Sequence, residues 1–424
     1  MTRAAAVLAL LLLAAAPGEA QTPTEVRLDI TSGGRRVRVH CEALKPGGER
    51  AAGATSVQAD EVLAADLRHS AVFVVSRGWV PGEQAFDVQA TIGGRWELRG
   101  SQVRFTGEVR DVPAGRPILV RDYRGPLAEW RTLVHRFADD VVLQFTGEPG
   151  VASTRIAFVV QQGRDKELWV MDADGARARP LTADRSIALS PAWSPEGSLL
   201  LFTSYRGGGP QVWVIPSAGG RAFLVSGRPG LNTSPSYSPD GRDIVCTLSQ
   251  DGNAEIYVLD ARGGSPRRLT HHRAIDTSPC WSPTGREIAF TSDRGGSPQV
   301  YVMDREGGNV RRLTYDVDHT DSPAWSPRGD RIAFVARTAQ GFDVYVTRPD
   351  GTGTRLVVSG GSNENPRWSP DGRHLVFASN RDGAYGLWVT DLDDRPPRKL
   401  DTGGRIALSP AWSPRPPSEG HAAP

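Results

Sequence analysis

A regular alternation of apolar and polar positions runs through the C-terminal part of the chain. In each period an apolar run such as Glu287–Phe290 is followed by a polar loop, an alternating run such as Gln299–Asp304, a Gly-rich turn and a short segment such as Val310–Thr314. Period-two alternation is typical of half-buried strands. With one further Trp-containing segment, each period therefore predicts four short β-strands separated by turns.

One aromatic motif, Ser-Pro-x-Trp-Ser-Pro-x-Gly, marks the same point of every period. Its copies, including a Tyr variant, a looser copy and a shortened last copy, are Ser190–Gly197, Ser234–Gly241, Ser278–Gly285, Ser322–Gly329, Asn365–Gly372 and Ser409–Pro414. The central aromatic residues are spaced 44, 44, 44, 43 and 44 residues apart. Four-stranded units that repeat every ~40 to 50 residues are typical of β-propeller blades.

The two ends of the repeat complete each other. The first unit has no Trp segment before Ile156, and no strands follow the last Trp segment around Trp412. We therefore predict that Leu408–Pro414 forms the inner strand of the blade that begins at Thr154. This closes a six-bladed propeller over residues 151–414 and removes the exposed sheet edge of an open array. The repeated Trp, Ser-Pro and Gly residues are expected to pack blades and form turns.

Residues 21–150 lack the repeat and predict a small α/β domain. The pattern predicts helices over 60–73 and over 127–141, the second ending near Gly147, and strands at 87–92, 95–98, 103–109 and 118–121. Whether Glu25–Ile30 is an edge strand or a mobile tail stays open. Residues 415–424 are expected to form a disordered tail.

The N-terminus has the pattern of an export signal. Arg3 precedes an apolar run, Ala4–Ala16, and the small residues Gly18 and Ala20 suit cleavage before Gln21. This run is shorter than the ~20 residues that span a bilayer, which disfavours a membrane anchor. We expect residues 1–20 to be a signal peptide and the mature protein to be soluble outside the cytoplasm.

Charge and cysteine content exclude some partners and sites. Lys plus Arg (50) nearly balances Asp plus Glu (48), whereas a nucleic-acid-binding protein needs a one-sided basic field. Cys41, Cys246 and Cys280 form no close pairs and have no interleaved His, so no zinc site or disulfide framework is indicated. A Cys246–Cys280 bridge stays conceivable, but two small buried residues are favoured.

Motifs of known enzyme classes do not occur. The chain has no Gly-x-Ser-x-Gly elbow, Walker loop or His-Glu-x-x-His helix. One polar cluster could serve a metal-dependent hydrolase or lyase at the channel mouth: His271, His272, Asp276, Asp316, Asp318, His319 and Asp321. Equivalent loops of other blades, Arg228–Asn232 and Gly360–Glu364, lack such ligands. We therefore expect no enzyme activity, no cofactor and no metal. A propeller that senses a small ligand in its channel is a third hypothesis.

A polar rim is the favoured functional surface. Each blade repeats the same path, so the loops before the Ser-Pro-x-Trp motif emerge on one face. The rim is expected to contain Asn232, Thr233, Asp276, Thr277, Thr320, Asp321, Asn363 and Glu364, with apolar residues at 187–189 and 406–408. A concave polar rim with an apolar sector suits the docking of a protein loop or a small domain.

Most of the chain after the signal resembles the TolB family. The resemblance rests on Glu25–Leu28, Val62–Arg68, Ala138–Val142, Thr154–Val160 and the Ser-Pro-x-Trp series with its closing Pro410–Pro414. It implies a periplasmic component of the Tol-Pal envelope system that supports outer-membrane integrity and invagination during cell division. One departure is the charged run Arg35–Cys41, where the family has a more apolar segment.

The resemblance also implies two protein partners. The propeller face would bind the lipoprotein Pal, chiefly through Asn232, Thr233, Ser234, Thr277 and Ser278. The N-terminal segment would bind TolA through the residues Glu25, Val26, Arg27, Leu28, Asp29 and Ile30.

Overall fold

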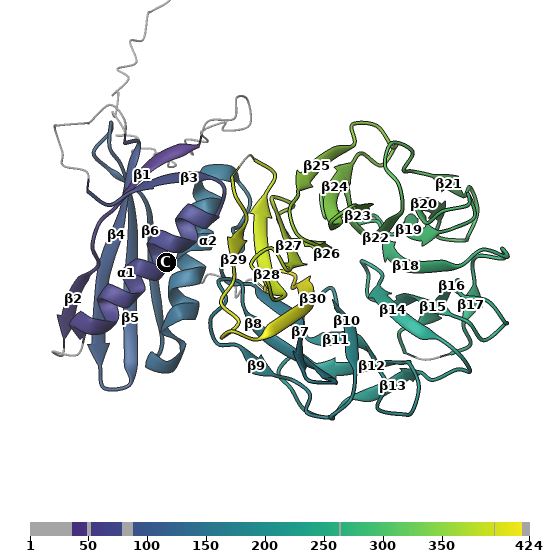
Figure 1. Cartoon of the computed structure of the whole chain (residues 1–424). Helices are drawn as coiled ribbons and strands as arrows, with labels where there is room; N and C mark the ends of the chain where they lie inside the picture. The colour runs from purple at the N-terminus through teal and green to yellow at the C-terminus, as the bar shows by residue number, and fades with distance from the viewer. Residues whose placement is uncertain (1–35, 49–51, 79–87, 263, 394, 418–424) are drawn as a thin grey trace, which may run out of the picture.

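The structure is a computed structural model that describes residues 36–48, 52–78, 88–262, 264–393 and 395–417. Three sequence predictions fall outside these ranges, namely the signal peptide over 1–20, the segment Glu25–Ile30 and most of the predicted C-terminal tail. Figure 1 shows an N-terminal α/β domain beside a ring of β-sheets. The described residues of the ring form six four-stranded sheets, so the predicted fold class is confirmed.

The N-terminal domain is a mixed sheet with two helices packed against it. Its strands run in the order β3-β1-β4-β5-β6, and β2 pairs with β4. The pairs β1–β3, β1–β4 and β2–β4 are parallel, whereas β4, β5 and β6 form an antiparallel meander. The elements are β1 (Val37–Cys41), β2 (Lys45–Gly48), α1 (Ala52–His69), β3 (Phe73–Ser76), β4 (Ala90–Arg99), β5 (Gln102–Asp111), β6 (Pro117–Pro126), η1 (Leu127–Glu129) and α2 (Trp130–Thr146).

Close contact between α2 and the sheet depends on a glycine. A Cβ atom at Gly107 of β5 would lie 2.5 Å from the ring of Phe137 on α2. The Phe137 ring instead packs edge-on against Phe105, with 5.3 Å between the ring centroids. Both phenylalanines are fully buried, together with Trp96, at the centre of this domain's apolar core. The apolar stripe predicted for the second helix is therefore the face that meets the sheet.

Several predicted elements of this domain have different bounds in the structure. The first helix, predicted over 60–73, begins at Ala52, and the second, predicted over 127–141, is the α-helix Trp130–Thr146. The first helix ends at His69 instead of Phe73, because Ser70 turns the chain: its hydroxyl donates to the Leu67 carbonyl (2.7 Å) and accepts from the Val72 amide (3.2 Å). The two strands predicted on either side of Gly93-Gly94 are one strand, β4. A Cβ at Gly94 would lie 2.2 Å from the Thr106 carbonyl oxygen, so this glycine permits close strand pairing and does not mark a turn.

The propeller arranges its six sheets around a central channel. Neighbouring inner strands contact one another all the way round the ring. The inner strands are β10 (Ala188–Trp193), β14 (Asn232–Tyr237), β18 (Asp276–Trp281), β22 (Thr320–Trp325), β26 (Asn363–Trp368) and β30 (Ile406–Trp412). The second strands are β7 (Arg155–Gln162), β11 (Leu199–Ser204), β15 (Asp243–Leu248), β19 (Glu287–Ser292), β23 (Ile332–Thr338) and β27 (His374–Ser379).

The outermost strand of each blade is shorter and more exposed than the other three. The third strands are β8 (Asp165–Asp172), β12 (Gln211–Pro216), β16 (Glu255–Asp260), β20 (Gln299–Asp304), β24 (Gly341–Thr347) and β28 (Gly386–Asp391). The outermost strands are β9 (Arg179–Pro180), β13 (Phe223–Ser226), β17 (Arg267–Arg268), β21 (Arg311–Arg312), β25 (Arg355–Val358) and β29 (Arg398–Lys399). Apolar clusters fill the spaces between neighbouring blades, as in the cluster that joins Val376 of one blade to Ile156 of the next.

The last strand closes the ring. Strand β30 pairs antiparallel with β7, so the sheet that starts the propeller in sequence obtains its inner strand from the C-terminal part of the chain. The indole Nε1–H of Trp412 also donates to the Thr154 hydroxyl at 2.7 Å. The predicted closure is therefore confirmed, and Figure 1 shows the first and last parts of the propeller side by side.

Candidate functional site

In four of the six blades the rim loop is held by the first residue of the inner strand. The expected rim residues Asn232, Asp276, Thr320 and Asn363 are each 0 % exposed. The Asn232 side-chain amide donates to the Arg228 carbonyl at 2.7 Å, and its Oδ1 accepts from the Arg228 amide at 3.0 Å. These four residues therefore cannot present their side chains to a partner, which corrects the prediction of an exposed rim at these positions.

The other three buried residues play the same part in their blades. The Asp276 carboxylate pairs with Arg294 at 2.8 Å, and Asn363 accepts from Arg381 at 2.9 Å. The Thr320 hydroxyl accepts from the Val300 amide at 3.0 Å. A side chain at this position points into the blade, where the polar groups of the turning chain need partners. The polar residues that suggested a docking surface thus fix the shape of the loops.

The next positions along each inner strand remain accessible. Thr233, Thr277, Asp321 and Glu364 are partly exposed. Asp321 accepts from the Thr291 hydroxyl at 2.8 Å, so its carboxylate is held in place. Glu364 accepts a hydrogen bond from the Tyr385 hydroxyl. Half of the predicted polar rim is therefore available at the surface, in fixed orientations.

Ser234 and Ser278 occupy a strained bulge at the channel. Both have a left-handed backbone, with φ of 52° and 53°, and both line the central cavity. The pairing of inner and second strands shifts register at this point in each blade. The equivalent residues of the other blades share this conformation: Ser190, Ser322, Asn365 and Ser409. The bulge is thus a repeated structural element of the propeller.

Exposed apolar side chains on the rim were not all predicted. Leu231 is 40 % exposed and Ile275 is 52 % exposed, and each directly precedes a buried first residue of an inner strand. Their backbone amides donate to the Ser249 hydroxyl (2.7 Å) and to Asp293 (2.8 Å), which anchors both loops. Ile406, in the predicted apolar sector, is also exposed. Strand alternation could have located Leu231 and Ile275, because neighbours of an inward-facing residue face outward.

The alternative catalytic cluster does not assemble. His271, His272, Asp316 and Asp318 are exposed, and His319 is partly exposed. Among the described residues, three potential metal ligands gather within 4.8 Å of one another only at Asp66, His135 and Asp174, far from these loops in sequence. The geometry therefore gives no support to a hydrolase or lyase site at the channel mouth.

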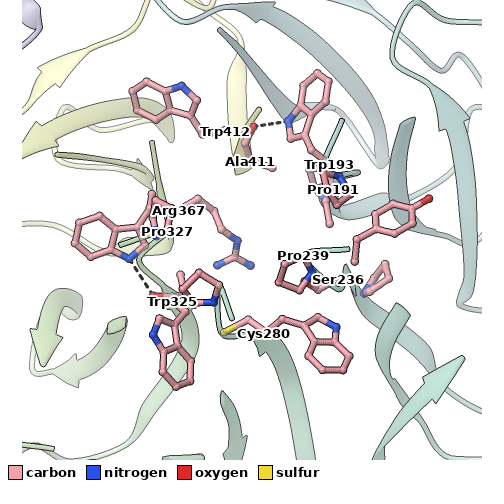
Figure 2. Close-up of a pocket in the computed structure, with 18 of the residues that line it drawn as sticks. Pro191, Trp193, Ser236, Pro239, Cys280, Trp325, Pro327, Arg367, Ala411 and Trp412 are labelled. Atoms are coloured by element: carbon pink, nitrogen blue, oxygen red, sulfur yellow. Dashed lines mark hydrogen bonds between the residues drawn. The ribbon is translucent and has the colours of Figure 1, made fainter. Parts of the chain in front are cut away.

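A central cavity of about 460 Å³ is lined by the repeated motif of all six blades. Figure 2 shows this cavity with Cys280 and Arg367 on its wall. The cysteines are free thiols, and Cys246 is buried as expected, but Cys280 is partly exposed to the cavity. Burial raises the pKa of the Cys280 thiol to about 11. Its protonated form therefore dominates at neutral pH.

A buried ionic cluster joins the two domains. His135 on α2 lies between two carboxylates, with its Nδ1 2.6 Å from Asp66 Oδ2 on α1 and its Nε2 3.7 Å from Asp174 Oδ2 on the propeller. Arg131 also forms an ion pair with Asp174. Burial disfavours a charged imidazole, but the two carboxylates outweigh it and raise the pKa of His135. This cluster could not be predicted from local sequence patterns, because its members come from three separate parts of the chain.

The connection between the domains is fixed by further hydrogen bonds. Asp139 on α2 accepts from the backbone amides of Ala152 (2.7 Å) and Ser153 (3.0 Å). On the propeller side, the His374 ring lies 2.9 Å from the His69 carbonyl oxygen, and Arg328 pairs with Glu148 at 2.7 Å. The N-terminal domain is therefore docked on the propeller through α1, α2 and the segment that joins them.

Comparison with known proteins places this fold in a family. The family model "TolB beta propeller domain" matches residues 142–416. The chain belongs to the TolB family. It is similar to the Tol-Pal system protein TolB of Anaeromyxobacter dehalogenans (strain 2CP-C), with 39% identity over 224 residues, which is 49% of this chain and 51% of that protein. A TolB of Jannaschia sp. (strain CCS1) is 35% identical over 178 residues, 36% of this chain and 39% of that protein.

A solved TolB structure extends the likeness beyond the propeller. The crystal structure of TolB from Acinetobacter baumannii has a TM-score of 0.80 and 26% identity, and the match covers 90% of this chain and 97% of that one. The match to the first curated TolB relatives covers between 40% and 51% of their length. Within the described residues, no helix of this TolB-family chain is long and apolar enough to cross a membrane.

Proposed function

We propose that this chain is a non-enzymatic, periplasmic component of the Tol-Pal envelope system. It docks a Pal-like lipoprotein on the propeller rim and a TolA-like protein through Glu25–Ile30, and so supports outer-membrane integrity and invagination during cell division. The observation that carries the rim proposal is the pair of exposed apolar residues, Leu231 and Ile275, whose backbone amides are held by hydrogen bonds to Ser249 and Asp293. The TolB names of the relatives support the choice of system.

The chemistry of the rim suits a protein partner. Apolar side chains next to polar groups that keep accessible hydrogen-bonding atoms are typical of docking surfaces. A rigid loop loses little conformational entropy on binding, which strengthens association. The partner contacts are proposed for Leu231 and Ile275 together with the accessible residues of the predicted set, Thr233, Ser234, Thr277, Ser278, Asp321 and Glu364.

Calorimetric titration of the purified chain with the soluble domain of the Pal-like lipoprotein from the same organism tests the rim. The double substitution Leu231→Asp with Ile275→Asp is expected to weaken binding at least ~30-fold, because two apolar contacts of ~1 kcal/mol or more are lost. The matched control is Phe223→Asp with Leu224→Asp, which changes exposed apolar residues on the outermost strand β13. Equal affinity of both double variants would exclude the rim as the docking surface.

The N-terminal segment is tested separately with the soluble C-terminal part of the TolA-like protein. Deletion of residues 24–30 is expected to abolish this interaction and to leave binding of the Pal-like domain intact. A scrambled order of the same residues is the control for length and composition. Unchanged TolA binding after deletion contradicts the assignment of Glu25–Ile30.

A further inference from the structure

One position on the channel wall breaks the sixfold repeat. The residue between Pro and the central aromatic is small in five blades, where it is Ala192, Ser236, Cys280, Ala324 or Ala411. In the remaining blade it is Arg367 on β26. All six residues line the same cavity of about 460 Å³, and Figure 2 shows the Arg367 guanidinium projecting into its middle.

The guanidinium of Arg367 has few partners within the chain. Its Nη1 donates to the Pro366 carbonyl at 2.9 Å, and this is its one hydrogen bond among the described residues. Asp321 and Cys280 are the acidic groups close enough to influence it, but Asp321 Oδ1 already accepts from Thr291 (2.8 Å) and the Ser322 amide (2.6 Å). Burial lowers the pKa of the Arg367 guanidinium. Arginine nevertheless keeps its charge in proteins.

The rest of the wall supplies no countercharge. The described residues that line the cavity are Ser, Pro, Ala, Trp, Tyr, Cys and Asn, apart from Arg367 itself. A partly buried cation without a paired carboxylate attracts an anion. The cavity is reachable from solvent, because the lining residues Pro195, Pro239 and Pro327 are exposed.

We propose that the propeller channel binds a small carboxylate anion and that Arg367 is its anchor. The planar guanidinium donates paired hydrogen bonds that match the two oxygens of a carboxylate. The serine hydroxyls of the wall offer further donors, and a cavity of this size holds a small organic acid. This site is distinct from the docking surface on the rim, because Arg367 lines the channel cavity whereas Leu231 and Ile275 do not.

Cys280 provides a built-in reporter for the test, because it lines the same cavity while Cys41 and Cys246 are buried. Alkylation of Cys280 by iodoacetate and by iodoacetamide, two reagents of similar size and different charge, is measured by peptide mass spectrometry at fixed pH and ionic strength. The iodoacetate-to-iodoacetamide rate ratio is expected to fall about tenfold in Arg367→Gln, because the attraction of a nearby cation is lost. Arg242→Gln, which changes an exposed arginine, is the matched control and is expected to keep the wild-type ratio.

Ligand protection completes the test. Succinate is expected to slow both alkylation reactions at Cys280 in the wild type and neither reaction in Arg367→Gln. Arg367→Lys keeps the charge without the planar fork, so it is expected to retain the rate ratio but lose most of the succinate protection. Should Arg367→Gln fail to fold, full succinate protection in Arg367→Lys would overturn the role of Arg367 as carboxylate anchor. An unchanged rate ratio in Arg367→Gln overturns the anion site, and protection by sulfate equal to that by succinate overturns its assignment to carboxylates.

Discussion

At the scale of single residues, the left-handed serines explain why Ser-Pro recurs in the inner strands. At Ser278 the backbone turns through φ 53°, and the strand pairing shifts register between Thr277 and Cys280. This bulge buries Pro279 and directs Cys280 to the channel. Serine and asparagine accept such a turn at a lower cost than bulky or β-branched residues do. The motif is therefore a requirement of the backbone at the channel wall.

Replacement of Ser278 tests this requirement. Ser278→Val is expected to lower the free energy of unfolding by about 1–2 kcal/mol or more, because a β-branched side chain is strained at positive φ. Ser278→Gly is expected to be close to neutral. Urea unfolding followed by tryptophan fluorescence measures both. Thr277→Val, one residue earlier in the same strand, is the control, and a larger loss there than in Ser278→Val would contradict the strain argument.

At the scale of elements, the central tryptophans connect neighbouring blades in two different ways. Trp368 on β26 donates its indole N–H to the Ala324 carbonyl on β22 at 2.9 Å, and Trp193 on β10 donates to Ala411 on β30 at 2.9 Å. Trp281 is as buried as Trp368, yet its indole nitrogen has no hydrogen-bond partner among the described residues. The same motif position therefore carries a hydrogen bond in some blades and apolar packing alone in another.

This difference predicts unequal effects of one substitution. Trp368→Phe is expected to destabilise the protein by about 1 kcal/mol more than Trp281→Phe, because it leaves the Ala324 carbonyl without its donor. Both variants lose similar apolar area, so the comparison isolates the hydrogen bond. Chemical unfolding monitored by far-ultraviolet circular dichroism gives the two free energies. A greater loss in Trp281→Phe would show that packing, not the hydrogen bond, dominates between these blades.

Blade number and ring closure could be predicted from sequence because each period carries its own strands and turns. The 44-residue interval between Trp281 and Trp325 needs no knowledge of distant contacts. The burial of Asn232 could not be predicted in this way, because it depends on hydrogen bonds from its side-chain amide to the carbonyl groups of Arg228 and Gly230 in the preceding loop. The pairing of Asp66 with His135 depends on how two helices pack, and the residues are 69 positions apart in sequence. Local patterns thus predict elements, whereas site geometry requires tertiary packing.

At the scale of the whole molecule, the contact between domains is rich in titratable groups. His69 at the end of α1 is surrounded by Arg398, Arg68, His374 and Arg395. Burial and these positive groups lower the pKa of His69 from 6.5 to about 3. Asp139 behaves oppositely, because burial raises its pKa to about 6 despite its hydrogen bonds to the linker. The pKa shifts of His69 and Asp139 therefore make the stability of the protein depend on pH in opposite directions.

The sign for His69 predicts a loss of stability in acid. The unfolded chain binds a proton at His69 near pH 6.5, whereas the folded protein does not, so stability present above that pH is lost as pH falls toward 3. His69→Gln is expected to flatten the fall of the melting temperature between about pH 7 and pH 5. His271→Gln changes an exposed histidine and serves as the control. Asp139 contributes stability that is lost as pH rises through about 6, and this contribution is the same in the wild type, His69→Gln and His271→Gln. A wild-type slope in His69→Gln would contradict this assignment.

The pairing of β30 with β7 also sets an order of events during synthesis. Strand β7 emerges from the ribosome long before β30, and its inner edge has no native partner until residues 406–412 have been made. The ring cannot close before residues 406–412 have been made, so the nascent propeller stays open while the five blades between β9 and β30 are synthesised.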